Sequence, residues 1–234
     1  MSTTKIYLKP GKEVPVRRLH PWIFSGAIQR TEGNAGDGDI VDVFDRSGTF
    51  LGTGHFHHGS IAVRLLSFEP ADLNDLGFWT KKLHTALDVR RTVGLAGAAD
   101  TDCFRLVHGE GDGLSGLIVD IYGSAAVLQC HSIGMHRQRE LIAQALQQVL
   151  GDHLEVVYDK SREALPGKYA ESIQNEYLIG TADAGQMVIE NGVRFRVDWE
   201  TGQKTGFFLD QRDNRQLLAQ FVRDKTVLNT FCYT

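Results

Sequence analysis

The sequence predicts a multidomain protein of the α/β and β classes, in which a small all-β unit precedes a mixed α+β domain. Short β-rich runs, separated by Gly, Asn and Asp clusters, fill residues 1 to about 68. From Asp75 onward the apolar residues recur with a helical period instead. A third observation is the pair Asn191-Gly192 between two β-rich runs, which is typical of a tight hairpin turn.

The first unit contains four candidate strands. They are "KIYL", "GDIVDVFD", "TFLGTGHF" and "SIAVRLLSF", with one short helical entry between the first two. Strands this short and this closely spaced favour a barrel or a sandwich. Pro70, within "EPADLND", marks a plausible boundary after them.

The second unit begins with a helix predicted from Asp75 to about Val93, and one face of that helix carries Trp79, Leu83 and Leu87. Three strands follow, "CFRLVHG", "GLIVDIYG" and "AAVLQCHS". A second helix is predicted from about Gly134 to Leu150, and "LEVVYDK" reads as the next strand. This β-β-β-α-β order predicts one compact α+β domain rather than repeated βαβ units.

Residues 186–199, "QMVIENGVRFRVDW", predict a hairpin with a type I′ turn. A short helix is expected from about Gln211 to Val222, with Asp210 as its N-cap. Val227 to Thr230 then reads as the opening of a buried strand, because the segment is apolar on both faces.

Composition excludes several classes of protein. The chain has 234 residues and a formal net charge of −4, which weighs against purely electrostatic binding of nucleic acid and requires local basic patches instead. No run approaches the roughly 18 apolar residues of a membrane span, and the N-terminus lacks the apolar core of a secretion signal. Three widely spaced cysteines, Cys103, Cys130 and Cys232, exclude a disulfide framework and fit a reducing cytoplasm.

Three motifs suggest a ligand, a metal or a nucleophile but are better explained by structural roles. "GEGDGLSG" at 109–116 precedes a strand, whereas a dinucleotide loop must open a helix, so we expect a strand connection. "HFHH" at 55–58 suggests a metal, but no carboxylate or cysteine lies nearby in sequence, so solvent-facing histidines and no metal are expected. Cys232 lies in an apolar strand without a neighbouring base and is expected to be buried.

Two segments are more informative. "RRLHPWIFSGAI" at 17–28 combines cations with aromatic rings, which suits RNA, although the rings would equally suit the core of a small barrel. "QKTGFFLDQRDNR" at 203–215 crowds charged groups at the start of a helix, where ligands of α/β sheets bind. An ordinary capped surface helix explains the second pattern slightly better from spacing alone.

Taken together, "HPWIFSGAI", "RLVHGEGDGLSGLIVDIYG", "ENGVRFRVDWETGQKTGFFLDQRDNR" and "VLNTFCYT" resemble the 23S rRNA (cytosine-C5)-methyltransferases that begin with a PUA domain. The resemblance covers the whole chain in order. It implies a PUA-like RNA-binding β-barrel at 1–70, a central α+β domain at 71–184 and the incomplete N-terminal part of a Rossmann-like methyltransferase domain at 185–234. It also implies S-adenosylmethionine as cofactor, 23S rRNA as partner and a cytoplasmic location without membrane contact.

The resemblance implies roles for individual residues as well. The expected cofactor-binding residues are Lys204, Phe208, Asp210, Arg212, Asn229 and Phe231, and the expected RNA-binding residues are Arg17, Arg18, His20 and Trp22. No catalytic residue is expected in this chain. The thiol that attacks C6 of cytosine would come from a later segment, Cys232 occupies a position on the cofactor strand, and Thr230 stands where several relatives carry cysteine.

We therefore expect the chain to be an inactive N-terminal portion of a methyltransferase. A stand-alone PUA-type RNA-binding protein is the main alternative, and a module that binds partners other than nucleic acid is a third hypothesis. Dimerisation through the central domain is compatible with the sequence, but nothing in the sequence specifies it.

Overall fold

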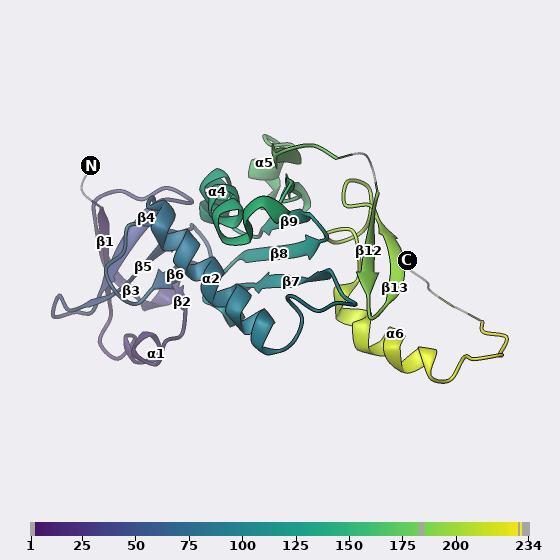
Figure 1. Ribbon diagram of the computed structural model, residues 1–234. Coiled ribbons are helices and arrows are strands. Elements are labelled where there is room, and N and C mark those ends of the chain that lie inside the picture. Colours follow the sequence, from purple (N-terminus) through teal and green to yellow (C-terminus); the bar gives the residue numbers. More distant parts are fainter. Residues whose placement is uncertain (1–2, 183–184, 229, 231–234) are drawn as a thin grey trace.

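A computed structural model describes residues 3–182, 185–228 and 230 of the chain. Within these residues the strands form three sheets, of six, five and two strands. Figure 1 shows the six-stranded sheet at one end of the molecule, the five-stranded sheet in the middle, and the two-stranded sheet with the last helix at the other end.

The six-stranded sheet is built from the first 67 residues in the order β2-β6-β5-β4-β1-β3. Its strands are β1 (Thr4–Leu8), β2 (Trp22–Phe24), β3 (Ile28–Glu32), β4 (Ile40–Phe44), β5 (Phe50–Phe56) and β6 (Ile61–Ser67). A short helix, α1 (Val14–Arg17), and a 3₁₀ turn (Ser25–Ala27) flank β2. All pairs are antiparallel except β1 with β4. Alternate residues such as Ile6, Val41 and Val63 face a separate apolar core.

The five-stranded sheet has the order β11-β10-β9-β8-β7. Its strands are β7 (Cys103–His108), β8 (Leu117–Tyr122), β9 (Ala125–Cys130), β10 (Val156–Asp159) and β11 (Glu176–Ile179). The expected β-β-β-α-β order is confirmed, since β9 and β10 pair in parallel and helices connect them. The sequence analysis assigned no element to β11, which extends the sheet by an antiparallel pairing with β10.

Helices cover one face of this sheet. Helix α2 (Leu76–Thr92) begins where Asp75 accepts a hydrogen bond from the Gly77 amide, and it buries Trp79 and Leu83 as its period predicts. The helix expected from Gly134 to Leu150 is instead two helices, α3 (Ile133–Arg137) and α4 (Arg139–Leu150). They join at Gln138, whose φ of −94° and ψ of 2° interrupt the helical path.

The other face of the sheet carries the hairpin of β12 (Gln186–Glu190) and β13 (Val193–Val197). Its type I′ turn is confirmed, because Asn191 and Gly192 have φ of 50° and 78°. Trp199, which follows the hairpin, stacks on Tyr122 of β8 with ring centroids 6.5 Å apart. The hairpin and the central sheet therefore share one apolar core.

The last helix differs from its expected form. A 3₁₀ turn (Leu209–Gln211) comes first, and α6 runs only from Arg212 to Ala219. Asp210 is not its N-cap, because its side chain lies in the preceding turn and pairs with Lys204. The other short elements are two 3₁₀ turns around β10 (Gly151–His153 and Arg162–Ala164), a further 3₁₀ turn (Gly109–Asp112) and α5 (Gly167–Ala170).

The strand expected at Val227–Thr230 is wrong for Val227 and Leu228, which are exposed and have no regular structure. A parallel strand needs hydrogen-bonded neighbours, and no strand of the described residues pairs with this segment. Asn229 and residues 231–234, Cys232 included, lie outside the described residues.

Candidate functional site

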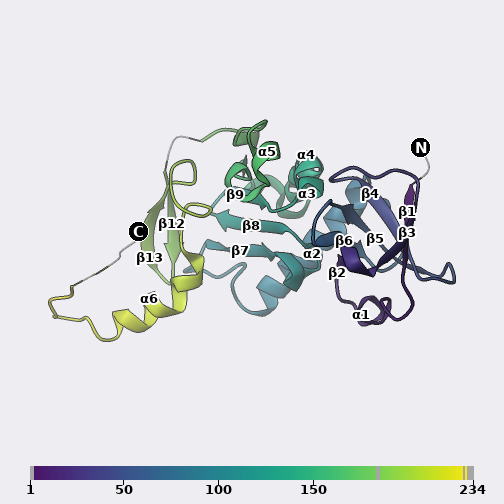
Figure 2. The ribbon, with the colours of Figure 1, turned by 180° about the vertical axis from the view of Figure 1, so that it is seen from behind.

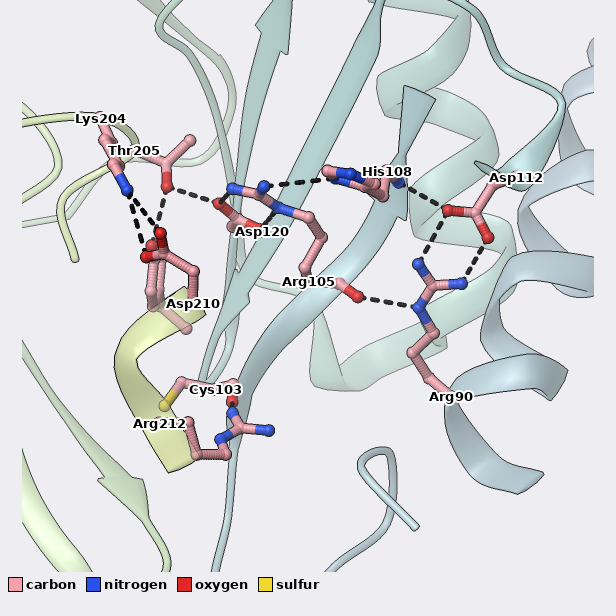
Figure 3. Close-up of polar contacts among 11 residues, drawn as sticks. Arg90, Cys103, Arg105, His108, Asp112, Asp120, Lys204, Thr205, Asp210 and Arg212 are labelled. Carbon is pink, nitrogen blue, oxygen red and sulfur yellow. Dashed lines mark hydrogen bonds and ion pairs between the residues drawn. The ribbon is translucent and has the colours of Figure 1, made fainter. Parts of the chain in front are cut away.

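The segment at 203–212 contacts strand β8 of the central sheet through Thr205, and Figure 3 shows two of its predicted site residues, Lys204 and Asp210, beside that contact. Lys204 Nζ contacts both carboxylate oxygens of Asp210 at 3.1 and 3.0 Å. The same ammonium lies 4.2 Å from the centroid of the Phe208 ring. The hydrogen bond from Lys204 lowers the pKa of Asp210, so this carboxyl is charged at neutral pH. Both charged side chains are about half exposed and accessible to a ligand.

A buried carboxylate holds this segment to the sheet. Asp120 on β8 is fully buried, and the Thr205 hydroxyl donates to it at 2.6 Å. Arg105 on β7 forms two parallel hydrogen bonds with the same carboxylate, at 2.8 and 2.9 Å. Tyr122 reaches the Thr205 hydroxyl at 2.8 Å. Each polar group in this network has a hydrogen-bond partner. The network therefore fixes the position of Thr205 and, with it, that of the adjacent Lys204.

Arg212 lies apart from the other three predicted cofactor residues. Its guanidinium donates to the Cys103 carbonyl and approaches Glu190 at 3.4 Å, and Figure 3 shows it beside Cys103, away from the Lys204–Asp210 pair. Arg215 binds the same Glu190 carboxylate at 2.7 and 2.9 Å. Glu190 is 2% exposed, so two arginines neutralise one buried charge. These contacts anchor the start of α6 to the hairpin. Two further predicted cofactor residues, Asn229 and Phe231, lie outside the described residues.

The four predicted RNA-binding residues divide into two kinds. Arg18 and His20 are exposed. Arg17 pairs with Asp45 at 2.7 Å, and the Trp22 indole donates to Glu110 at 2.9 Å and to Ser115 at 3.0 Å. Trp22 is thus neither a core residue nor a free surface ring, because it joins the first sheet to the turn after β7.

The glycine-rich stretch 109–116 is confirmed as a strand connection between β7 and β8. Asp112 within it accepts from Arg90 at 2.8 Å and from the His108 amide at 2.6 Å. These contacts hold the connection in place and do not require a bound ligand.

The histidines at 55–58 do not all face solvent, and the expectation is wrong for His55. Its ring is 3% exposed, packs against Gly134 of α3, and has no hydrogen-bond partner among the described residues. Strand β5 faces the central unit at this point, which the local sequence could not reveal. His57 and His58 lie beside Asp37.

The two described cysteines are poor nucleophiles. Cys103 and Cys130 are buried, and burial raises the pKa of the Cys103 thiol to about 11. Burial also raises the pKa of Cys130. Both thiols therefore stay protonated at neutral pH. Among residues 3–182, 185–228 and 230, no group of three or more His, Cys, Asp or Glu side chains could hold a metal ion.

Sequence reasoning missed five residues that shape this site, namely Arg105, Asp120, Glu190, Thr205 and Arg215. Asp120 and Glu190 stand as charged residues in otherwise apolar strand patterns, which is the signal that could have identified them. Their arginine partners are distant in sequence, so only the fold pairs them.

Comparison with known proteins shows what the two parts of the chain resemble. Residues 6–68 match the family model of a PUA-like domain, and residues 125–234 match that of an S-adenosylmethionine-dependent methyltransferase. The cofactor of the matched family is S-adenosylmethionine. Within the described part of the chain, no helix is long and apolar enough to cross a membrane.

Particular relatives are proteins named ribosomal RNA large subunit methyltransferase I. The chain is 37% identical to that of Pseudoalteromonas atlantica, 38% to that of Aeromonas hydrophila and 36% to that of Escherichia coli O1:K1. Each match covers 99% of this chain and 58% of the relative, so the chain spans little more than half the length of these curated relatives.

Solved structures agree on the fold. A structure described as a SAM-dependent methyltransferase from Streptococcus mutans matches with a TM-score of 0.75 at 23% identity, over 93% of this chain and 54% of that one. A second methyltransferase structure, complexed with SAH, matches with a TM-score of 0.74 at 23% identity, over 92% of this chain and 53% of that one.

Proposed function

We propose that this chain is the N-terminal portion of an S-adenosylmethionine-dependent methyltransferase that modifies C5 of a cytosine in 23S rRNA. One observation carries the proposal. A single collinear match to large subunit rRNA methyltransferases runs through 99% of the chain, and the two family models fall in the expected order along it. The main alternative, a stand-alone PUA-type RNA-binding protein, would not require similarity beyond the first unit.

We assign a separate role to each of three consecutive segments of the chain. Residues 1–70 would bind RNA, residues 71–184 would form the central α+β domain, and residues 185–234 would begin the methyltransferase domain. We place the protein in the cytoplasm with its rRNA. Sedimentation of the purified protein would separate monomer from homodimer.

The chemistry of the Lys204–Asp210 pair suits the cofactor. An ammonium can bind the carboxylate of the methionine moiety, and a carboxylate can accept hydrogen bonds from the ribose hydroxyls or the amine. The Phe208 ring offers an apolar face beside them. Lys204, Phe208 and Asp210 are therefore the proposed contacts, with Asn229 and Phe231 as further candidates. Arg212 is the weakest, because Glu190 and the Cys103 carbonyl already hold its guanidinium.

Methylation at C5 of cytosine requires a thiolate. The ring carbon is a poor nucleophile until a sulfur adds to C6 and pushes electrons toward C5, which can then take the electrophilic methyl group that S-adenosylmethionine supplies. A base removes the C5 proton, and the C6–S bond breaks. Neither Cys103 nor Cys130 suits this role, because both are buried and protonated. Cys232 lies outside the described residues, and we propose that it does not supply the thiolate either and that the 234-residue chain by itself is inactive.

Three measurements on the purified chain test the proposal. Fluorescence anisotropy with fragments of 23S rRNA should show binding that weakens steeply with salt, because phosphate contacts release counterions. Incubation with radiolabelled S-adenosylmethionine and 23S rRNA should transfer no label. Absence of RNA binding at low salt contradicts the RNA assignment, and label incorporation contradicts the proposed inactivity. Tight cofactor binding, with a Kd on the order of micromolar by calorimetry, would show that the pocket is more complete than proposed.

A further inference from the structure

The face of the central sheet opposite α2 and α4 is covered by an apolar core at one end of its strands and is more polar and exposed at the other end. Pairing aligns Cys103, Tyr122 and Ala125 in one row across β7, β8 and β9, and the core shared with the hairpin covers this row. Pairing likewise aligns His108, Ile118 and Gln129 at the opposite ends of the same strands. This second row is polar at both ends, and each of its residues is partly or fully exposed. Figure 2 shows β7 to β9 between β2 and β6 on one side and the hairpin with α6 on the other.

Basic side chains surround the second row. Arg105 of β7 lies beside His108, with Nη1 3.4 Å from the imidazole Nδ1. His131 directly follows β9 and is exposed. Arg64 comes from β6 of the first sheet, in register with Trp22 and His55. Its Cδ lies 3.8 Å from the point where a side chain on Gly116 would begin, next to Ser132. We call Arg64, Arg105, His108 and His131 the basic strip.

The acidic groups near the strip already have partners, and Asp120 is paired with Arg105 of the strip itself. Asp120 is buried beneath Arg105 and bound to Thr205. Glu110 accepts from Trp22 and from Ser115, at 2.9 and 2.7 Å. Arg64 makes no hydrogen bond or ion pair with any residue that the structure describes, although Glu110 lies near enough to act on its charge.

Loss of solvent and neighbouring charges both shift pKa values in the strip. Loss of solvent around the ring lowers the pKa of His131 most, and the charges of Arg105 and Arg64 lower it further, against an opposing effect of Glu110. Burial lowers the pKa of Arg64. A bound anion would relieve both effects.

We propose that the basic strip binds consecutive phosphates of a single RNA strand and directs that strand from the first sheet toward the Lys204–Asp210 pair. RNA as the ligand rests on the proposed function, whereas the location rests on the geometry. Strands β7 and β9 are two strand spacings apart, about 10 Å, so the strip extends across several strands and suits neighbouring phosphates of a chain.

The ends of the strip fit a path between the two predicted sites. At one end Arg64 is the cross-strand partner of Trp22, which belongs to the predicted RNA-binding set. At the other end Arg105, through Asp120, is joined to Thr205, which is adjacent to Lys204 in the chain. Gln129 and His108 add hydrogen-bonding groups that can contact phosphate or sugar oxygens.

The test is anisotropy of the purified chain with a fluorescein-labelled single-stranded RNA of about a dozen nucleotides, long enough to span several phosphates. The strip variants are Arg64→Gln and His131→Gln. Arg105 is left intact, because its loss would expose the buried Asp120 charge. The matched controls are Arg91→Gln and His84→Gln, two exposed residues of α2 on the helical side of the sheet.

We expect each strip variant to weaken binding about 3- to 10-fold at low salt and to reduce the slope of log K against log salt by about 0.7 for each phosphate that the variant no longer neutralises. The controls should leave affinity and slope unchanged. Because Arg64 is partly buried, thermal unfolding is recorded for each variant, and the exposed His131 supplies a second, independent result.

The possible results test the basic strip and the proposed function separately. If Arg18→Gln weakens binding while both strip variants bind like the parent chain, the strip is wrong and the RNA assignment stands. If the parent chain does not bind RNA at low salt, both fail. If inorganic phosphate at millimolar concentration shifts the His131 imidazole resonance but RNA of any length competes no better, the strip is a small-anion site and the proposal is overturned.

Discussion

The hydroxyl of Thr205 donates a 2.6 Å hydrogen bond to Asp120, and both residues are buried. Eighty-five positions separate them in the chain. This contact attaches the segment that carries Lys204 and Asp210 to strand β8 of the central sheet. The predicted cofactor residues are thus positioned by a domain that would not itself touch the cofactor.

Thr205→Val should therefore destabilise the protein although it preserves shape. The change removes the donor to Asp120 and the acceptor for the Tyr122 hydroxyl. Leaving buried polar groups unpaired costs about 1 to 3 kcal/mol of unfolding free energy. Urea unfolding measures the loss, and Thr85→Val on the exposed side of α2 should change the free energy by less than about 0.5 kcal/mol. Equal stability of the two variants would mean that the buried contact contributes nothing.

Glu190→Gln should have a larger effect. The carboxylate is buried and binds Arg212 and Arg215, so neutralising it leaves two poorly solvated cations without a counter-charge. Loss of one partner from a buried ion pair costs on the order of 3 kcal/mol. Denaturant unfolding should show this loss, whereas Glu171→Gln at the exposed end of α5 should be neutral. Unchanged stability of Glu190→Gln would contradict the anchoring role assigned to this pair.

Acid should destabilise the protein through His55. Burial, with smaller effects of Arg137 and Arg64, lowers the pKa of His55 to about 4 from its ordinary 6.5. The unfolded state therefore binds more protons, so stability is complete above about pH 6.5 and falls as the pH drops toward 4. The loss at pH 4 should reach at most about 3 kcal/mol, since each pKa unit corresponds to about 1.4 kcal/mol.

His55→Leu is the variant that tests this account. The His55 ring has no hydrogen bond to lose among the described residues, so stability at pH 7 should change by less than about 1.5 kcal/mol. Its acid-dependent loss between pH 6.5 and 4 should be smaller than that of the parent chain. His84→Gln serves as the control and should retain the parent profile. A parent-like profile in His55→Leu would assign the acid sensitivity to other groups.

Gly134→Ala should disrupt the contact between the first sheet and α3. A Cβ atom at this position would stand 2.2 Å from His55 Cγ, so the ring or the helix must move. Overpacking of this kind costs about 1 to 3 kcal/mol, which thermal unfolding can detect. Gly167→Ala at the start of α5 is the matched change, because nothing lies within 4 Å of its Cβ position. A harmless Gly134→Ala would show that the two units do not pack as described.

Local signals were sufficient for much of the fold. The period of Leu76–Thr92 predicted α2, and Asn191-Gly192 predicted the hairpin turn. The wrong predictions fall at residues whose contacts involve side chains that the local sequence pattern does not reveal. Asp210 looked like a helix cap but pairs with Lys204, and His55 looked exposed but faces Gly134 across two units.

For the site as well, the sequence identified the segment but not the contacts within it. The segment at 203–215 was recognisable from its crowd of charged residues, yet spacing could not show that Lys204 and Asp210 meet while Arg212 turns to Glu190. Those contacts depend on the hairpin and β7, which join this segment only in three dimensions. Trp22 stays a predicted RNA-binding residue, and its hydrogen bond to Glu110, 88 positions away, has no local signature in the sequence.

The most direct test of the central claim is the nucleoside content of 23S rRNA from cells with and without the gene that encodes this chain. Mass spectrometry of the digested rRNA should show that one 5-methylcytidine is lost when the gene is inactivated and restored when it is returned. An unchanged set of methylated cytidines in the 23S rRNA of the inactivated strain would contradict the proposed function.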